Sequence, residues 1–174
     1  PGMRIVFSPE FLTEKNAVGD MLNANRVIVG GDLDDSRVVL QYFLEADRER
    51  VENGQCVLVQ STAQAAEMCK LFGNGLLFAK VLFSNEVHMM CQVMGINYDE
   101  VRVLTSLDPR IGGAHTAVPG PDGYLGAGGH CFPKDMHNLR FEARKFNVPE
   151  KMFTAVLERN GEVRQEKDWE KMND

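Results

Sequence analysis

The stretch STAQAAEMCKLFGN (residues 61–74) opens the longest regular segment of this chain. Ser61 and Gln64 fit the capping box S/T-x-x-E/Q, which marks a helix start. Apolar residues then recur at helical spacing as far as Met94, and Gly95 follows as a typical helix stop. The pattern predicts one helix over 62–94, about nine turns, which is long for a globular protein. From residue 61 onward the chain is therefore expected to be helical.

Shorter helical patterns follow this one. A helix that begins at Asn97 or Asp99 is expected to run through Leu107, and two more are expected over 131–146 and 149–172. Residues 108–130 are rich in glycine and proline and are expected to form a loop, and a loop of that length is usually functional or disordered. The charged tail from Glu162 is expected to be a solvated face.

The first 60 residues have a different character. Strand-like runs lie near residues 4–7, 26–30 and 55–59, and a helix is expected from about Asp35 to Arg50. Its buried face is expected to carry Val38, Val39, Tyr42, Phe43 and Ala46. The fold class is thus mainly α with a small α/β portion: an α/β segment over 1–60 and an all-helical domain over 61–174.

Glycines between the second strand and the helix raise the question of a phosphate-binding loop. Gly30-Gly31-Asp32 stands at that position, but the chain contains neither G-x-G-x-x-G nor a Walker-type loop. A simple turn is the preferred interpretation.

Composition excludes several classes of function. A net charge of −6 and the lack of a basic stripe argue against nucleic acid. No apolar run approaches the ~20 residues of a membrane span, and no signal peptide opens the chain. The four cysteines are scattered, and the histidines lack metal spacing, which predicts neither disulfides nor a metal site and favours a cytoplasmic protein. The chain opens at Pro1 almost directly with a strand-like run, as expected of a piece of something longer.

A cysteine in the stretch Gly128-Gly129-His130-Cys131-Phe132-Pro133-Lys134-Asp135 is a candidate nucleophile. Pro133 suits the first turn of a helix, so Cys131 is expected at a helix N-terminus, where free N–H groups and Lys134 favour the thiolate. Asp135 lies four residues on and would share a helix face with the sulfur, where it could handle a proton or water. The alternative is a buried structural cysteine followed by a first-turn carboxylate that stabilises the helix.

Two further polar clusters are candidates. Lys70 and Asn74 share a face of the long helix, either as site residues or as its polar seam. Glu10 and Glu14 follow the first strand, where α/β folds meet ligands but where helix first turns also favour acids.

Taken in order, six motifs resemble the nucleotide-sugar dehydrogenases, the UDP-glucose/GDP-mannose dehydrogenase family, and most resemble the branch that oxidises UDP-glucose. They are S-P-E-F-L-x-E from Ser8, R-V-I-V-G-G from Arg26, S-T-A-x-A-A-E-x-x-K-L-x-x-N from Ser61, N-E from Asn85, D-x-R-I-G from Asp108 and G-G-x-C-F-P-K-D from Gly128.

The resemblance implies an NAD-dependent oxidation of the sugar C6 alcohol to a carboxylate by two hydride transfers. Cys131 would be the nucleophile that forms a thiohemiacetal and then a thioester. Lys70 would steady negative charge on the C6 oxygen with Asn74 as a hydrogen-bonding partner, Asp135 would order a water, and Glu14 would assist thioester hydrolysis.

Binding roles also follow from the resemblance. Glu10, Phe11, Leu12 and Gly128 would contact substrate, and Arg110 would reach the nucleotide sugar on the other subunit of a homodimer. Glu14 and Lys134 would contact the cofactor.

The family organisation implies that 1–60 is the C-terminal part of a Rossmann NAD domain and 61–174 the helical dimerisation domain. A nucleotide-binding domain would be absent, and we expect the chain alone to have little or no activity. Ala127 stands where the family usually has an aromatic residue, and His130 is familiar in the branch that oxidises N-acetylated amino sugars.

Other readings stay open at this point. The chain could be a non-catalytic dimerisation module or could act on GDP-mannose or UDP-N-acetylmannosamine. It could also be a Cys-His hydrolase that pairs Cys131 with His115, His130 or His137.

Overall fold

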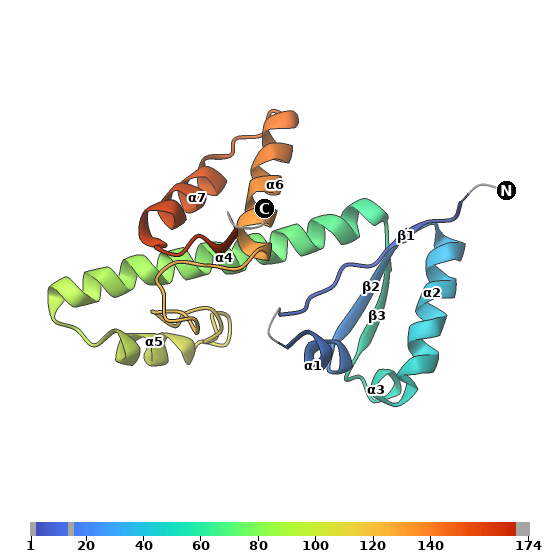
Figure 1. The fold of residues 1–174 in the computed structure, drawn as a ribbon. Helices are drawn as coiled ribbons and strands as arrows, with labels where there is room; N and C mark the ends of the chain where they lie inside the picture. The colour runs from blue at the N-terminus through green and yellow to red at the C-terminus, as the bar shows by residue number, and fades with distance from the viewer. Residues whose placement is uncertain (1–2, 14–15, 170–174) are drawn as a thin grey trace. The chain divides into compact units, whose positions relative to one another are not determined.

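The computed structural model describes residues 3–13 and 16–169, and the chain falls into two compact units (Figure 1). The first unit is Pro1–Lys70 and the second is Leu71–Asp174.

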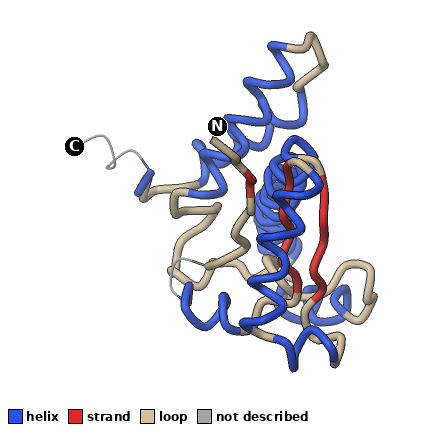
Figure 2. The backbone as a smooth tube through the Cα atoms, turned by 90° about the vertical axis from the view of Figure 1, so that its right-hand side faces the viewer, coloured by secondary structure: helices blue, strands red, loops and turns tan. Residues whose placement is uncertain are grey.

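A small mixed sheet forms the centre of the first unit. β1 (Val6–Phe7) pairs antiparallel with β2 (Arg26–Gly31), and β2 pairs parallel with β3 (Val57–Ser61). Figure 2 shows the two longer strands side by side. All three predicted strands are therefore present, although β3 begins two residues later than expected.

Among the described residues, three helices accompany the sheet. α1 (Ala17–Leu22) was not expected from the sequence, and α2 (Leu33–Ala46) and α3 (Arg48–Glu52) replace the single helix predicted from Asp35 to Arg50. The break falls at Asp47, whose φ of −140° and ψ of 47° are not helical. Periodicity did not reveal this break because apolar and charged residues continue through it at helical spacing.

The buried face of α2 is rotated from the predicted one. Ser36 is fully buried, where its Oγ donates to Asp32 O at 2.6 Å and accepts from Gln60 Nε2 at 2.6 Å. These bonds turn the serine side of the helix inward. The prediction is consequently wrong for the exposed Val38, Tyr42 and Ala46 and correct in part for the half-buried Val39 and Phe43.

Four helices shape the second unit. They are α4 (Ala63–Met94), which begins in the first unit, α5 (Tyr98–Ser106), α6 (Cys131–Lys145) and α7 (Lys151–Val163). The long helix and the helix that starts at the cysteine are confirmed, and α6 packs against α7 (Figure 1). The helix expected as far as Met172 ends at Val163.

Side-chain caps define the starts of α4 and α5. Thr62, and not Ser61, caps α4, because its Oγ1 accepts from the N–H of Ala65 at 3.2 Å. Ser61 is the last residue of β3, which corrects the predicted capping box. Asn97 caps α5 by accepting from Asp99 N at 3.0 Å, as predicted.

The core of the second unit joins three helices and the glycine-rich loop. Its buried residues are Leu71, Phe78, Leu82, Ala127, Met136 and Leu139, with Phe153, Val156, Leu157 and Val163 packed against them. The loop over 108–130 is folded onto this core, since Thr116, Val118 and Ala127 are buried. The mainly helical fold with a small α/β part is thus confirmed. In the described ranges no helix is long and apolar enough to cross a membrane.

Candidate active site

The start of α6 presents the candidate nucleophile. Cys131 is the first residue of the helix, and its side chain is exposed with a free thiol. Pro133 is buried in the first turn, where its missing N–H costs no hydrogen bond. The predicted location at a helix N-terminus is therefore confirmed. N–H groups of a first turn stabilise an anion at this end of a helix.

One turn further on, Asp135 is buried but fully partnered. The residue is 1% exposed, and its Oδ2 accepts from Asn74 Nδ2 at 2.6 Å. Lys134 Nζ donates to Oδ1 at 2.5 Å. A buried carboxylate is costly unless it is paired and hydrogen-bonded, and both oxygens have partners here. The structure thus joins Lys134 and Asp135 of α6 to Asn74 of α4, one helical turn after Cys131.

The first unit holds the other half of the predicted residues. Lys70 Nζ forms an ion pair with Glu10 Oε1, and the Lys70 side chain is only 16% exposed. Glu10 Oε2 also accepts from the N–H of Leu12 at 3.2 Å, which fixes the segment after β1. Glu14 lies outside the described residues.

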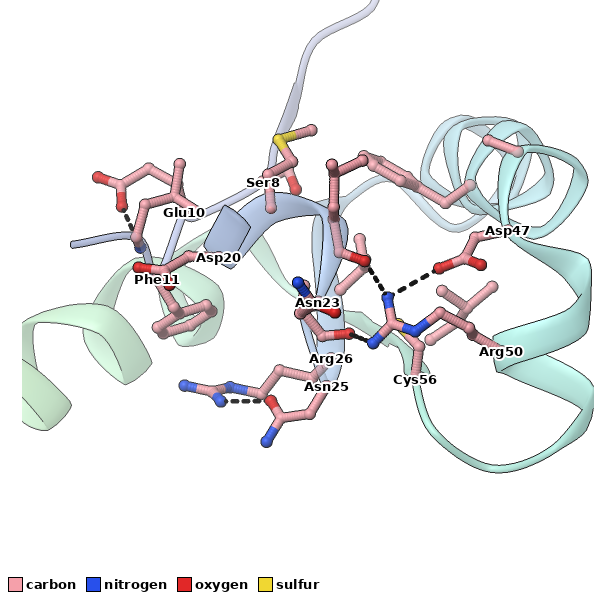
Figure 3. Close-up of a pocket in the computed structure, with 18 of the residues that line it drawn as sticks. Ser8, Glu10, Phe11, Asp20, Asn23, Asn25, Arg26, Asp47, Arg50 and Cys56 are labelled. Atoms are coloured by element: carbon pink, nitrogen blue, oxygen red, sulfur yellow. Dashed lines mark hydrogen bonds and ion pairs between the residues drawn. The ribbon is translucent and has the colours of Figure 1, made fainter. Parts of the chain in front are cut away.

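This segment forms one wall of a cavity of about 890 Å³ in the first unit (Figure 3). The predicted substrate residues Glu10, Phe11 and Leu12 all line it. The guanidinium of Arg26 lies 3.9 Å from the centre of the Phe11 ring. Arg50 lines another wall of the cavity. Its guanidinium donates to Leu22 O at 2.5 Å and to Ala24 O at 2.9 Å, and it forms an ion pair with Asp47 at 3.0 Å.

Arg110 is held on the surface of the second unit. Its Nη2 pairs with Asp108 Oδ2 at 2.6 Å, its backbone N–H donates to Oδ1 at 3.0 Å, and its side chain is 87% exposed. The pKa of Asp108 is lowered, mainly by the hydrogen bond from the guanidinium and to a smaller extent by the one from the backbone N–H. The Asp108 side chain also raises the pKa of Arg110. Lys80 fixes the next residues of the motif by donating to Ile111 O at 2.8 Å and Gly112 O at 3.1 Å.

The histidines of the hydrolase alternative have other contacts. His115 packs against the ring of Phe132 at 5.6 Å, and its pKa is lowered by burial and by Lys80. His137 contacts Arg140, and its pKa is lowered by burial and by that charge. His130 is the N-cap residue of α6, and its side chain forms no capping hydrogen bond. In residues 3–13 and 16–169 no three His, Cys, Asp or Glu side chains form a group that could hold a metal ion.

The glycines at the end of β2 do not form a dinucleotide cradle. A Cβ on Gly30 would lie 2.5 Å from Thr62 O and 2.8 Å from Ala63 Cα, so this glycine lets β2 approach the start of α4. The Asp32 side chain caps α2 by accepting from Asp34 N at 3.0 Å. Packing and capping explain the turn, so the residues at the end of β2 do not fit the phosphates of NAD.

Sequence reasoning missed three residues that hold the loop before Cys131: Asn160, Arg164 and Asp168. The charged tail was expected to be solvated, but Arg164 is buried and pairs with Asp122 Oδ2 at 2.7 Å. A signal was available, because Asn160 interrupts the apolar stripe of α7 between Leu157 and Val163.

Comparison with known proteins gives matches over most of the chain. A sequence profile of the UDP-glucose/GDP-mannose dehydrogenase family, central domain, matches residues 64–162. UDP-glucose 6-dehydrogenase of Streptococcus pneumoniae is 36% identical over 160 residues, which are 90% of this chain and 39% of that protein. UDP-glucose 6-dehydrogenase of Haloferax volcanii is 31% identical over 159 residues, which are 91% of this chain and 35% of that protein.

Solved structures agree with the sequence matches. The structure of a UDP-glucose dehydrogenase from Pyrobaculum islandicum superposes with a TM-score of 0.75 at 26% identity and covers 90% of this chain and 34% of that one. The chain thus spans between about a third and two fifths of the length of these relatives.

Proposed function

Because the chain belongs to the UDP-glucose/GDP-mannose dehydrogenase family, we propose that it carries the covalent part of an NAD-dependent oxidation of UDP-glucose to UDP-glucuronate. The observation that carries the proposal is the exposed Cys131 at the first position of α6, one turn before the buried Asp135. The names of the two relatives above favour UDP-glucose. GDP-mannose and UDP-N-acetylmannosamine are the alternative substrates.

The sulfur of Cys131 acts at two points in this proposal. Its thiolate adds to the carbon of a C6 aldehyde and forms the C–S bond of a thiohemiacetal. Loss of a hydride from this carbon would give the C6 thioester, and the thiolate leaves when water attacks that thioester. NAD is the hydride acceptor of the family. We derive no hydride transfer from this chain, because the glycines at the end of β2 are explained by packing.

Three polar residues of the second unit support this chemistry. Asp135 would order the attacking water and take up its proton, and the bonds from Asn74 and Lys134 hold the carboxylate in place. Asn74 would also bond the C6 oxygen. Lys134 would in addition contact the cofactor, and the backbone of Gly128 would contact the sugar.

The first unit would supply charge and substrate contacts. Lys70 lies one turn before Asn74 on α4 and would steady negative charge on the C6 oxygen. Glu10, Phe11 and Leu12 would bind the substrate from the wall of the cavity. We keep Glu14 as the proposed acid for thioester hydrolysis and as a cofactor contact.

We also propose that the chain forms a homodimer through α4. Five of its exposed apolar residues follow the spacing of a coiled-coil seam, and these five are between 56% and 90% exposed: Phe72, Leu76, Phe83, Met90 and Val93. In such a dimer the exposed Arg110 would reach the nucleotide sugar of the other protomer.

The test is to replace the matched region of the Streptococcus pneumoniae enzyme with residues 8–169 of this chain and to measure NADH formation. We expect turnover with UDP-glucose above that with GDP-mannose or UDP-N-acetylmannosamine. Cys131→Ala should lower kcat by about 10³-fold or more, since the nucleophile acts as a unit with its partners. If the Cys131→Ala chimera turns over as fast as the unmutated chimera, the proposal is rejected. The exposed α4 face would then indicate a non-catalytic dimerisation module.

A further inference from the structure

The turn that leads into α6 is held by side chains from the end of α7 and the residues after it. Asn160 is 2% exposed and pairs with both backbone groups of Ala127. Its Oδ1 accepts from the Ala127 N–H at 2.8 Å, and its Nδ2 donates to the Ala127 carbonyl at 3.0 Å. An asparagine side chain is an amide, so it pairs with a peptide group in both directions, as a neighbouring strand would.

The next residue of the turn lies against a guanidinium. A Cβ on Gly128 would be 2.0 Å from Arg164 Nη2 and 2.5 Å from its Cζ, so only glycine lets the backbone approach this closely. The Arg164 side chain is 2% exposed. It is fixed in turn by Asp122 at 2.7 Å and by the carbonyl of Glu166 at 2.7 Å.

The third contact lies two residues before the cysteine. Asp168 Oδ2 accepts from the N–H of Gly129 at 2.8 Å. Three successive residues of the turn therefore each meet one side chain of the C-terminal clamp, which we define as Asn160, Arg164 and Asp168.

The turn needs such support. Gly126 and Gly129 have φ values of 69° and 71°, in the left-handed region that glycine enters readily. A glycine-rich segment has many accessible conformations, and each contact to its backbone removes some of them.

We propose that the C-terminal clamp is a positioning device for Cys131, acting through the turn over 126–129. This inference rests on the proposed function, in which Cys131 is the nucleophile. The clamp fixes the direction from which the chain enters α6 and hence the location of the sulfur relative to the first-turn N–H groups and to Asp135. Its members are positioning residues and not catalytic ones.

The test uses the full chain and two readouts. The first is the rate at which iodoacetamide alkylates Cys131, divided by the rate at Cys69 in the same molecules. Cys69 is exposed and free in the body of α4. It lies one heptad before Leu76 of the exposed apolar row on that helix, so the two rates are compared at a dilution at which sedimentation shows a monomer. The second is hydrogen exchange of the amides over 126–131.

We expect Asn160→Asp and Asp168→Ala to lower the Cys131 to Cys69 ratio about fivefold, the size of a lost helix-terminus interaction. Both variants should also speed exchange over 126–131. Asp168→Asn keeps an oxygen that can accept from Gly129 N–H, so it should retain most of the wild-type ratio. The partly exposed Asp168 provides a test even if Asn160→Asp fails to fold.

A matched control separates positioning from stability. Val156→Ala removes apolar packing from α7, on the same helix as Asn160, and should leave the ratio unchanged. The proposal would be overturned if the clamp variants speed hydrogen exchange over 126–131 but keep the wild-type alkylation ratio. It would also be overturned if hydrogen exchange is unchanged in these variants. If Cys131 of the wild type is alkylated no faster than Cys69, the result would count against the proposed function. The clamp is tested separately, by the change in the alkylation ratio from wild type to variant.

Discussion

Asn74 and Asp135 are 61 residues apart in the sequence and are joined by a hydrogen bond of 2.6 Å from Nδ2 to Oδ2. The bond links α4 to α6 one turn after Cys131, and it gives a donor to a carboxylate that is 1% exposed. A single pair of side chains thus ties the helix that begins at the candidate nucleophile to the central helix of its unit.

Asn74→Leu should lower the free energy of unfolding by about 2 kcal/mol, because it leaves one oxygen of a buried charge without its donor. Urea denaturation followed by circular dichroism measures the change. Gln92→Leu is the matched control, since Gln92 is an exposed amide on the same helix and should change the free energy by less than about 0.5 kcal/mol. Equal effects of the two substitutions would show that the bond contributes nothing.

Iodoacetamide should modify Cys131 faster than Cys69 near neutral pH. Both thiols are exposed in the single chain, so the rates are compared at a dilution at which the chain is monomeric. Only Cys131 is the first residue of a helix, the end at which backbone N–H groups favour an anion, whereas Cys69 lies in the body of α4. Peptide mass spectrometry resolves the two rates in one sample. Cys56 and Cys91 are buried and should react only on unfolding, which provides an internal check that the chain is folded. Similar alkylation rates at Cys131 and Cys69 would contradict the prediction that the helix start makes Cys131 more reactive.

The sequence predicted those parts of the molecule that repeat or that carry a motif. Helical periodicity and a terminal glycine located α4 almost to the residue, and Pro133 with the downstream apolar residues located α6. The motif resemblance is confirmed by the family match over 64–162. The resemblance assigned Asn74 and Asp135 to one site but did not predict the hydrogen bond between them, since no local rule joins residues so far apart.

The errors have a common physical origin in long-range contacts. Ser36 is buried, and its hydroxyl accepts a hydrogen bond from the side chain of Gln60 in β3. For this reason the buried face of α2 differs from the predicted one. Arg164 is buried because Asp122 pairs with it across 42 residues, so a tail that is charged in sequence is not solvated in space. Tertiary partners of this kind overrule local polarity patterns, and a single sequence does not reveal them.

The ion pair between Arg164 and Asp122 should make stability depend on pH. Burial opposes ionisation of Asp122, but the hydrogen bonds from Arg164 and from the Tyr124 N–H, with the Arg164 charge, lower its pKa overall. A carboxyl whose pKa is lower in the folded state contributes stability that is complete above its unfolded value of about 3.9 and is lost as the pH falls through the folded value.

We therefore expect the difference in unfolding free energy between wild type and Asp122→Asn to be constant from about pH 5 to 7 and to shrink below about pH 4. Urea titrations at half-unit pH steps provide the measurement. Asp99→Asn is a suitable control, because Asp99 is a surface carboxylate paired within one turn of α5. A difference that grows on acidification would reverse the sign and reject the assignment.

The exposed apolar face of α4 should hold two copies of the chain together. Phe83 is 71% exposed near the middle of a row that continues to Met90 and Val93 on the same side of the helix. Burying such a row removes apolar surface from water at about 25 cal/mol per Å², and a glutamate in the centre of the row would carry an unpaired charge into the interface. Sedimentation equilibrium at micromolar concentration should show a dimer for the wild type and mainly monomer for Phe83→Glu. Gln92→Glu adds the same charge to α4 outside the row and should leave the dimer intact, so a monomeric wild type, or equal dissociation of the two variants, would contradict an interface on this face.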